Sequence, residues 1–409
     1  MIKTAFAAAL LATTTLAGAT PVQAENHTIA PGEGAAERLQ EALILAEPGD
    51  TIMLEAGRYA LTEGLSLDVE GVTIKGAGMD GDTQSILDFT NQQGAGEGLL
   101  VTSDNVTLRD FAVENAKGDG IKSKGADNII YHALRVEWTA GPKPTNGAYG
   151  IYPVESSNVL VQDSYVRGAS DAGIYVGQSE NIIVRGNRVV ENVAGIEIEN
   201  SNYAEVTDNL ATMNTGGILV FDLPGLPRVG GGDVLVARNA VIDNNTDNFA
   251  PEGNIVASVP AGTGVMVMAN TNVHVTENLL TNNKTSHVML IAYSQDYSDE
   301  RYQPRPVDVL VKGNVYGFGG TAPDIPGGKM LAAAVGGKLP PILSDGLAEG
   351  LQLMDAVPML NLNLERVGQP LAEARPDVIM PGSSEMSAPA KSGALAAVVL
   401  PAGMEARLQ

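Results

Sequence analysis

The sequence predicts an all-β fold, a single-stranded right-handed parallel β-helix whose coils are about 22 residues long, with an N-terminal capping helix and a C-terminal irregular segment. Three observations predict this solenoid. Short segments alternate apolar and polar residues, two types of segment recur at a constant spacing, and turn-forming residues separate them. A helical repeat is excluded because its apolar residues would recur about every 3.6 positions.

Two segment types define the coil. The first is a β-branched run that begins at Asp104, Asp127, Ser157, Glu180, Gly232, Thr271 and Val307. The second is a glycine before isoleucine or valine, at Gly120, Gly150, Gly173, Gly195, Gly217 and Gly264. Ile151, Ile174, Ile196 and Ile218 follow one another after 23, 22 and 22 residues. We therefore expect successive coils to stack as parallel strands with right-handed connections.

Asparagines recur at two turns of the coil. One column holds Asn187, Asn209, Asn239, Asn278 and Asn314, and the other holds Asn192, Asn214, Asn244 and Asn283. Stacked amides can hydrogen-bond from coil to coil, and asparagine tolerates the left-handed backbone conformation that tight turns require. Both columns are therefore expected to be structural, not ligand-binding.

The first residues have the features of an export signal. Lys3 precedes an apolar run, and small residues ending at Ala24 suit a cleavage site. The run is too short for a stable membrane span, and no cysteine follows it to carry a lipid. The sequence therefore predicts a signal peptide over 1–24 and a mature protein that is periplasmic or secreted.

The rest of the chain divides into a solenoid and its covers. Leu39, Leu43 and Ile44 lie at helical spacing and predict a helix over the first open coil, with the first strand following from Thr51. The β-helix is expected over 25–319, where the strand pattern ends. Residues 320–409 are expected to wrap or cap the barrel, partly as a flexible segment.

Composition and charge restrict the function. The chain has no cysteine, which removes disulfides and thiolate chemistry. Its formal charge of −23 repels nucleic acid and anionic membranes. The same charge disfavours an acidic polysaccharide unless Ca²⁺ or a local basic patch compensates. The histidines lack metal-ligand spacing, so no metal site is predicted, and Ca²⁺ is the one cofactor left open.

Ligands are expected outside the barrel, because its interior must be packed with side chains. Insertions at 139–149 and 246–263 precede strands of the second type, and insertions at 222–232 and 293–306 follow such strands. The first pair is four coils apart, about 19 Å at the spacing of neighbouring strands. Together these loops can frame an external groove.

The outward side chains along this groove follow from strand alternation. In order, they are basic (Lys122, Lys124), aromatic (Tyr152, Tyr175), acidic (Glu197, Glu199) and apolar (Leu219, Phe221, Met266, Met268, Met289, Ile291). The catalytic candidates are Lys122, Tyr152, Tyr175, Glu197 and Glu199, with Asp171 at the mouth of the groove. Lys124, Leu219, Phe221, Met266 and Met268 are the binding candidates.

The residue types in this row suit carbohydrate chemistry. Tyrosine and lysine neighbours can act as base and acid in β-elimination or epimerisation, and aromatic rings stack on sugars. Glu197 and Glu199 lie about 6.5 to 7 Å apart on one strand, near the separation of inverting glycosidases. The alternative is a solvated sheet face with cross-strand contacts.

The apolar part of the row would form a patch too large for a lone soluble protein to expose. Either the neighbouring loops and the C-terminal segment cover it, or a partner protein does. The sequence leaves both alternatives open.

The coil repeat, the opening helix before Pro48-Gly-Asp-Thr51 and the N-terminal signal resemble the secreted pectin-lyase-like β-helix proteins. Within that class, Asp171 to Ser179, Gly195 to Ser201 and Phe221 to Pro227 resemble a bacterial family of parallel β-helix repeat proteins. The activity of that family is not established. Its members tend to be encoded beside a second exported protein, which favours a protein partner.

The enzymes of the wider class carry motifs that this chain retains only in part. Tyr149 to Glu155 is similar to the motif of mannuronan C5-epimerases, but Tyr152 and Val154 stand where that motif has aspartate and histidine. Polygalacturonase-like hydrolases have a twin aspartate and Gly-His-Gly, and pectate lyases a clustered acidic Ca²⁺ site. We recognise neither in the sequence, and fold alone does not confer activity.

Two functions remain. The first is an exported carbohydrate-active or polysaccharide-binding protein and, if an enzyme, a polysaccharide lyase, epimerase or glycoside hydrolase. The second is a non-catalytic exported scaffold that docks a partner protein on the apolar patch.

Overall fold

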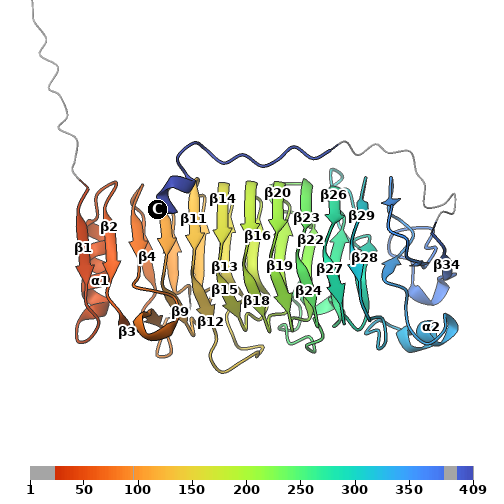
Figure 1. Ribbon diagram of the computed structural model, residues 1–409, viewed down its shortest axis with the longest axis horizontal. Helices are drawn as coiled ribbons and strands as arrows, with labels where there is room; N and C mark the ends of the chain where they lie inside the picture. The colour runs from red at the N-terminus through yellow and green to blue at the C-terminus, as the bar shows by residue number, and fades with distance from the viewer. Residues whose placement is uncertain (1–23, 95, 382–393, 409) are drawn as a thin grey trace, which may run out of the picture.

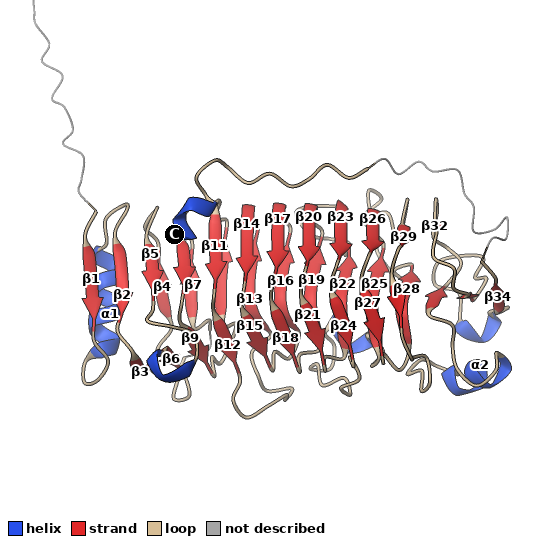
Figure 2. Ribbon diagram, viewed as in Figure 1, coloured by secondary structure: helices blue, strands red, loops and turns tan. Residues whose placement is uncertain are grey.

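The chain folds into a long solenoid, shown by a computed structural model that describes residues 24–94, 96–381 and 394–408. Successive coils stack their strands into three sheets within these residues (Figure 1). Strands make up most of the regular structure (Figure 2). The prediction of an all-β parallel β-helix is therefore confirmed. The predicted signal peptide, apart from Ala24, lies outside the described residues.

Sheet A collects the first segment type. Its strands are β1 (Asn26–Ile29), β2 (Thr51–Leu54), β5 (Thr73–Lys75), β8 (Thr107–Arg109), β11 (Ile129–His132), β14 (Ser157–Gln162), β17 (Glu180–Arg185), β20 (Asn202–Thr207), β23 (Gly232–Ala237), β26 (Thr271–Thr276), β29 (Leu310–Lys312) and β32 (Gln352–Leu353).

Sheet C collects the second segment type and carries the predicted site. Its strands are β4 (Leu65–Leu67), β7 (Leu99–Val101), β10 (Ile121–Lys124), β13 (Tyr149–Val154), β16 (Ala172–Gly177), β19 (Ala194–Glu199), β22 (Gly216–Phe221), β25 (Thr263–Met268), β28 (Ser286–Ile291), β31 (Ile342–Ser344), β33 (Met359–Asn361) and β34 (Asp377–Ile379).

Sheet B is a third face that the two segment types did not predict. Its strands are β3 (Gly57–Ala60), β6 (Ser85–Asp88), β9 (Ala112–Glu114), β12 (Arg135–Glu137), β15 (Tyr165–Arg167), β18 (Arg188–Val190), β21 (Leu210–Thr212), β24 (Ala240–Ile242), β27 (Leu279–Thr281) and β30 (Val315–Tyr316). Most of these strands are three residues long, too short for alternation to reveal.

The core is a continuous aliphatic column inside the three sheets. Ile151 pairs with Ile174, Ile174 with Ile196, and Ile196 with Ile218, as the repeat spacing predicts. These side chains and their counterparts in the other sheets are fully buried. Burying each large aliphatic side chain contributes about 1.5 to 3 kcal/mol. The inward residues therefore stabilise the stack, and the outward residues are available for other roles.

Both asparagine columns form the expected ladders. The Nδ2 of Asn192 donates to the Oδ1 of Asn214 at 3.0 Å, and that of Asn214 donates to Asn244 at 2.9 Å. One detail of the prediction was wrong. In both columns the left-handed conformation lies at the residue before each asparagine, such as Asp208 before Asn209 and Met213 before Asn214. The side chains therefore bond the coils together, while their neighbours make the turn.

The N-terminal end differs from the prediction in two details. Helix α1 (Ala35–Leu45) buries Leu39 and Leu43, but Ile44 is 65% exposed and does not belong to its inner face. Strand β1 precedes this helix and pairs with β2, so Thr51 does not begin the first strand. No helix among the described residues is long and apolar enough to cross a membrane.

Sheet pairing continues beyond the end predicted for the solenoid at residue 319. After helix α2 (Gly328–Ala334), β31 pairs with β28, β32 with β29 and β33 with β31. Strand β34 then closes sheet C in the antiparallel direction. Short 3₁₀ turns lie at η1 (Gly81–Thr83), η2 (Ile255–Ser258), η3 (Leu371–Glu373) and η5 (Glu405–Leu408).

Residues 394–408 form a strap that runs back along the outside of sheet A (Figure 1). Met404 is buried against Ile130, Leu160 and Ile183, which point outward from neighbouring strands. The guanidinium of Arg407 donates to the backbone carbonyls of residues 105 and 128. An apolar stripe on sheet A is therefore covered by the chain's own C-terminal segment.

Met404→Asp should release this strap from sheet A. Burial of a methionine side chain is worth about 1.5 to 3 kcal/mol, so tryptic cleavage after Arg407 should accelerate at least ten-fold. Mass spectrometry of the digest measures the rate. Met354→Asp is the matched control because Met354 is 62% exposed. Equal cleavage rates in the two variants would show that Met404 does not anchor the strap.

Candidate functional site

The predicted row of side chains lies together on the outer face of sheet C. Lys122 pairs in register with Tyr152. On the following strands, Tyr175 pairs with Glu197, Glu197 with Leu219, Leu219 with Met266 and Met266 with Met289. Asp171 immediately precedes β16 and lies beside the acidic part of the row. Alternation and repeat spacing therefore place these residues side by side without any knowledge of the loops.

Tyr175 and the acidic part of the row are buried, and Tyr152 is half-buried, contrary to the expectation of an open groove there. Tyr175 is 4% exposed, Glu197 1%, Glu199 6% and Asp171 4%. The loop between β24 and β25, residues 243–262, packs beside Tyr175 and Asp171. Its Val256 and Val259 pack in one apolar cluster with Tyr175 and Leu219, and the amide of Asn254 donates to Asp171 at 3.4 Å.

Three tyrosines form a compact cluster above β13 and β16. The rings of Tyr149 and Tyr152 are 4.5 Å apart between centroids, and each lies within 4.8 Å of the ring of Tyr175. Gly177 makes room for this arrangement, because a Cβ there would stand 2.2 Å from the Tyr175 hydroxyl. Gly177 is the register partner of Glu199, so the hydroxyl reaches that carboxyl across the glycine.

The carboxyl groups beside the tyrosines hold their protons unusually tightly. Burial raises the pKa of Asp171 to about 7, although hydrogen bonds from Tyr149 and Asn254 favour its ionised form. Burial also raises the pKa of Glu199 to about 7, against the hydrogen bond from Tyr175. Burial, and then the charges of Asp171 and Glu199, raise the pKa of Glu197 well above its ordinary value. The three form what we call the carboxyl cluster.

Two oxygens in the carboxyl cluster are buried without a hydrogen-bond partner among the described residues. They are Oδ1 of Asp171 and Oε1 of Glu197. Most buried polar atoms in folded proteins are paired, so an orphaned pair at one place is informative. A shared proton, a water or a substrate hydroxyl would satisfy these atoms.

Lys122 occupies the more accessible end of the row. Its ammonium lies 3.1 Å from Glu97 and 3.5 Å from Asp119, and 4.7 Å from the ring centroid of Tyr152. Burial opposes protonation of Lys122, but the hydrogen bond to Glu97 and nearby charges raise its pKa. Lys124 is exposed and lies 3.7 Å from Glu155. Neither lysine therefore leaves an uncompensated positive charge in the row.

Three further residues belong to this site and were not among the predicted candidates. Two of them, Tyr149 and Asp119, lie at the start of their coils. Burial raises the pKa of Asp119. Asp222 follows the row directly after Phe221. It accepts from the Gly231 N–H at 2.6 Å and from Asn270 at 2.8 Å, and burial raises its pKa to about 7. The acidic residue directly after a buried strand was the available signal for Asp222.

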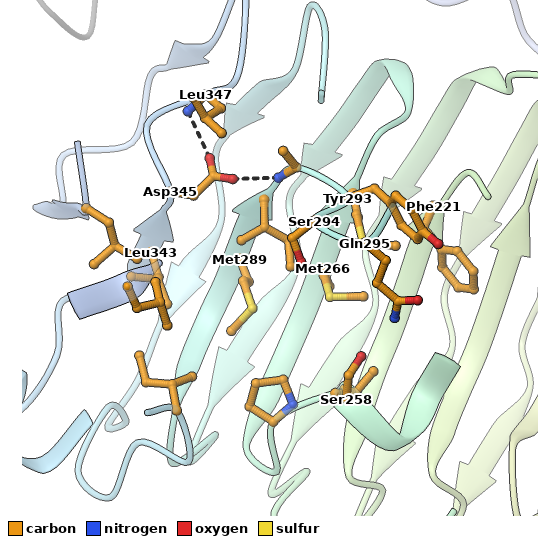
Figure 3. Close-up of a pocket in the computed structure, with 18 of the residues that line it drawn as sticks. Phe221, Ser258, Met266, Met289, Tyr293, Ser294, Gln295, Leu343, Asp345 and Leu347 are labelled. Atoms are coloured by element: carbon orange, nitrogen blue, oxygen red, sulfur yellow. Dashed lines mark hydrogen bonds between the residues drawn. The ribbon is translucent and has the colours of Figure 1, made fainter. Parts of the chain in front are cut away.

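The apolar part of the row lies beneath loops of the same chain and borders a cavity of about 310 Å³ (Figure 3). Leu219 and Phe221 are no more than 2% exposed, and Met266 and Met268 no more than 9%. Of the two alternatives for this patch, the structure shows cover by the chain's own loops. Within the described part of the chain, no three histidine, aspartate or glutamate side chains are placed to hold a metal.

Comparisons with known proteins agree with this architecture. Residues 71–223 match a family described as the right-handed beta helix region. No curated protein matches the sequence significantly. The A-module of Azotobacter vinelandii mannuronan C-5 epimerase AlgE4 is similar at 16% identity and a TM-score of 0.54, over 80% of this chain and 96% of the module. The AlgE6 A-module from the same organism is similar at 16% identity and a TM-score of 0.55, over 78% and 91%.

At these identities the likeness shows the fold alone. The sheets of stacked parallel strands, the family match and the two similar modules agree in one respect. The chain is a right-handed parallel β-helix protein.

Proposed function

We propose that this protein is a carbohydrate-active enzyme that cleaves a neutral glycan by acid–base catalysis at the carboxyl cluster. The observation that carries the proposal is the pair Asp171 and Glu197, two buried carboxyls with raised pKa values and one unpaired oxygen each. Neighbouring buried carboxyls with raised pKa values suit proton transfer, and perturbed groups of this kind concentrate at functional sites.

The surroundings of the two carboxyls assign their roles. Asp171 receives hydrogen bonds that stabilise its charge, and it serves as the general base. Glu197 serves as the general acid, because burial and the neighbouring carboxyls raise its pKa well above the ordinary value and so favour its protonated form. In hydrolysis, Glu197 gives its proton to the glycosidic oxygen as the bond to the anomeric carbon breaks. Asp171 takes a proton from the water that bonds to that carbon.

Charge favours a neutral glycan over an acidic one. The chain carries a net charge of −23, and Lys122, whose ammonium lies over the ring of Tyr152, is already paired with Glu97 and Asp119. A uronate would therefore meet carboxyls without a free positive partner. The tyrosine rings offer stacking surfaces that a neutral sugar can use.

Access to the carboxyl cluster requires movement of loop 243–262. Its polar link to the site is the 3.4 Å hydrogen bond from Asn254 to Asp171, which is long for such a bond. The more exposed end of the row, at Lys122 and Tyr152, gives a direction of entry. We also propose that the enzyme works after export, on the basis of the signal predicted over 1–24. A second exported protein as partner stays a prediction.

Release of new reducing ends from a panel of neutral and acidic polysaccharides tests the proposed function. One neutral polymer should be cleaved, with Ca²⁺ and with a chelator alike. Glu197→Gln should lower the rate about 10² to 10⁴-fold, the usual contribution of a general acid. Glu252→Gln is the control, because Glu252 is exposed on the covering loop. Silence across the whole panel, or full activity of Glu197→Gln, would refute the proposal.

A further inference from the structure

An apolar cavity adjoins the carboxyl cluster and has no role in the proposed acid–base chemistry. Its volume is about 310 Å³, within the usual range for small-molecule sites. Met266 and Met289 point into it from neighbouring strands, and the 292–295 segment and Leu343 form further walls (Figure 3). Loop 243–262 closes another side through Val256 and Val259.

The lining admits an uncharged apolar group. None of the described residues that line the cavity is lysine, arginine or histidine. Its one carboxylate, Asp345, already accepts from the backbone N–H of Ala292 at 2.6 Å and of Leu347 at 2.8 Å (Figure 3). A charged ligand group would therefore be desolvated without a partner, which is costly. Methionine side chains adapt to flexible chains, so the lining suits an alkyl or acyl chain.

The cavity and the carboxyl cluster are continuous along sheet C. Leu219, which lines the cavity, is the register partner of Glu197, and Phe221 is the register partner of Glu199. Neighbouring parallel strands are about 4.8 Å apart, so one molecule can contact both regions. Loop 243–262 bounds both, with Asn254 on Asp171 and Val256 in the cavity wall.

We infer that the substrate is a neutral glycan that carries an alkyl or acyl chain, with the sugar over the carboxyl cluster and the chain in the cavity. The glycan half of this inference rests on the proposed function. The apolar half rests on the cavity alone. The sugar of an amphiphilic glycoconjugate would contact the tyrosine and carboxyl side chains. Its alkyl or acyl chain would contact the leucine and methionine side chains of the same row.

Binding of hexyl, octyl and decyl β-glucosides below their micelle concentrations tests the cavity, measured by calorimetry. Affinity should rise up to about four-fold for each added methylene group that becomes buried. Met266→Gln and Met289→Gln should flatten this dependence on chain length. Met213→Gln should not, because Met213 lies outside the cavity and is 41% exposed. Ser294→Trp, which alters an exposed lining residue, should also weaken decyl glucoside if the methionine variants fold poorly.

The outcomes separate the cavity from the chemistry. Glu197→Gln should retain the chain-length dependence of binding while turnover of any glycan substrate is lost. Equal affinity for glucose and decyl glucoside, or unchanged dependence in Met266→Gln, would overturn the inference. Chain-length-dependent binding without turnover of any glycan would overturn the proposed function and leave the apolar binding site established.

Discussion

The free energy of unfolding should fall as the pH rises from about 5 to about 8, because the carboxyl cluster and Asp222 hold protons in the folded state. Asp171, Glu199 and Asp222 have pKa values raised to about 7, whereas in the unfolded chain they titrate near their ordinary values. Between these values the folded state binds more protons than the unfolded state. Raising the pH across that window therefore favours unfolding.

As the pH rises from about 5 to about 8, each such carboxyl should lower the free energy of unfolding by about 2 to 3 kcal/mol. The contributions do not add, because neighbouring charges raise one another's pKa. Three histidines with pKa values lowered by burial, His132, His274 and His287, act in the opposite sense below about pH 6.5. A comparison of variants therefore isolates the contribution of the carboxyls better than the pH dependence of the wild-type free energy of unfolding alone.

Glu199→Gln is the variant of choice, because glutamine keeps an acceptor for the Tyr175 hydroxyl without the charge. The free energy of unfolding of this variant minus that of wild type should increase by about 2 to 3 kcal/mol as the pH rises from about 5 to about 8. Chemical denaturation at a series of pH values gives the two curves. Glu252→Gln on the exposed covering loop should stay parallel to wild type. Parallel curves for Glu199→Gln would mean that Glu199 is already ionised in the folded protein.

The row of side chains on sheet C was predictable, whereas its burial was not. Pairing of Tyr175 with Glu197 and Glu197 with Leu219 follows from a period of two and a constant coil length. Cover by loop 243–262 depends on contacts such as Asn254 with Asp171, 83 residues apart, which no local pattern encodes. The raised pKa values follow from burial in the folded protein, so the sequence could suggest the residue types but not their protonation.

The late coils show the same limit. Strands β31, β32 and β33 are two or three residues long and lack the glycine-isoleucine signal of the earlier coils. Pairing with β28 and β29 holds them in place, so tertiary contacts decide their structure where local propensity does not. The asparagine ladders, by contrast, were predictable because the same side chain recurs at the same turn in coil after coil.

Asn239→Ala should be strongly destabilising because Asn239 links its neighbours on both sides of one ladder. Its Oδ1 accepts from the backbone N–H of Asn209 at 2.9 Å and from the side-chain amide of Asn209 at 3.0 Å. Its Nδ2 donates to the carbonyl of Val206 at 2.8 Å and to Asn278 at 3.0 Å. Asn239 is 1% exposed, so water cannot replace its hydrogen bonds after the substitution without disrupting the turn.

Alanine at this position leaves the backbone N–H of Asn209 and the carbonyl of Val206 buried without partners. Each unsatisfied buried group costs about 1 to 3 kcal/mol, so the total loss should be about 3 to 5 kcal/mol. Guanidinium denaturation measures it, with Asn91→Ala on the exposed surface as the control. Because each coil contacts only its neighbours, hydrogen exchange should accelerate most in β21, β24 and β27. A loss below about 1 kcal/mol would show that the ladder tolerates a gap and that the aliphatic core alone keeps these coils in register.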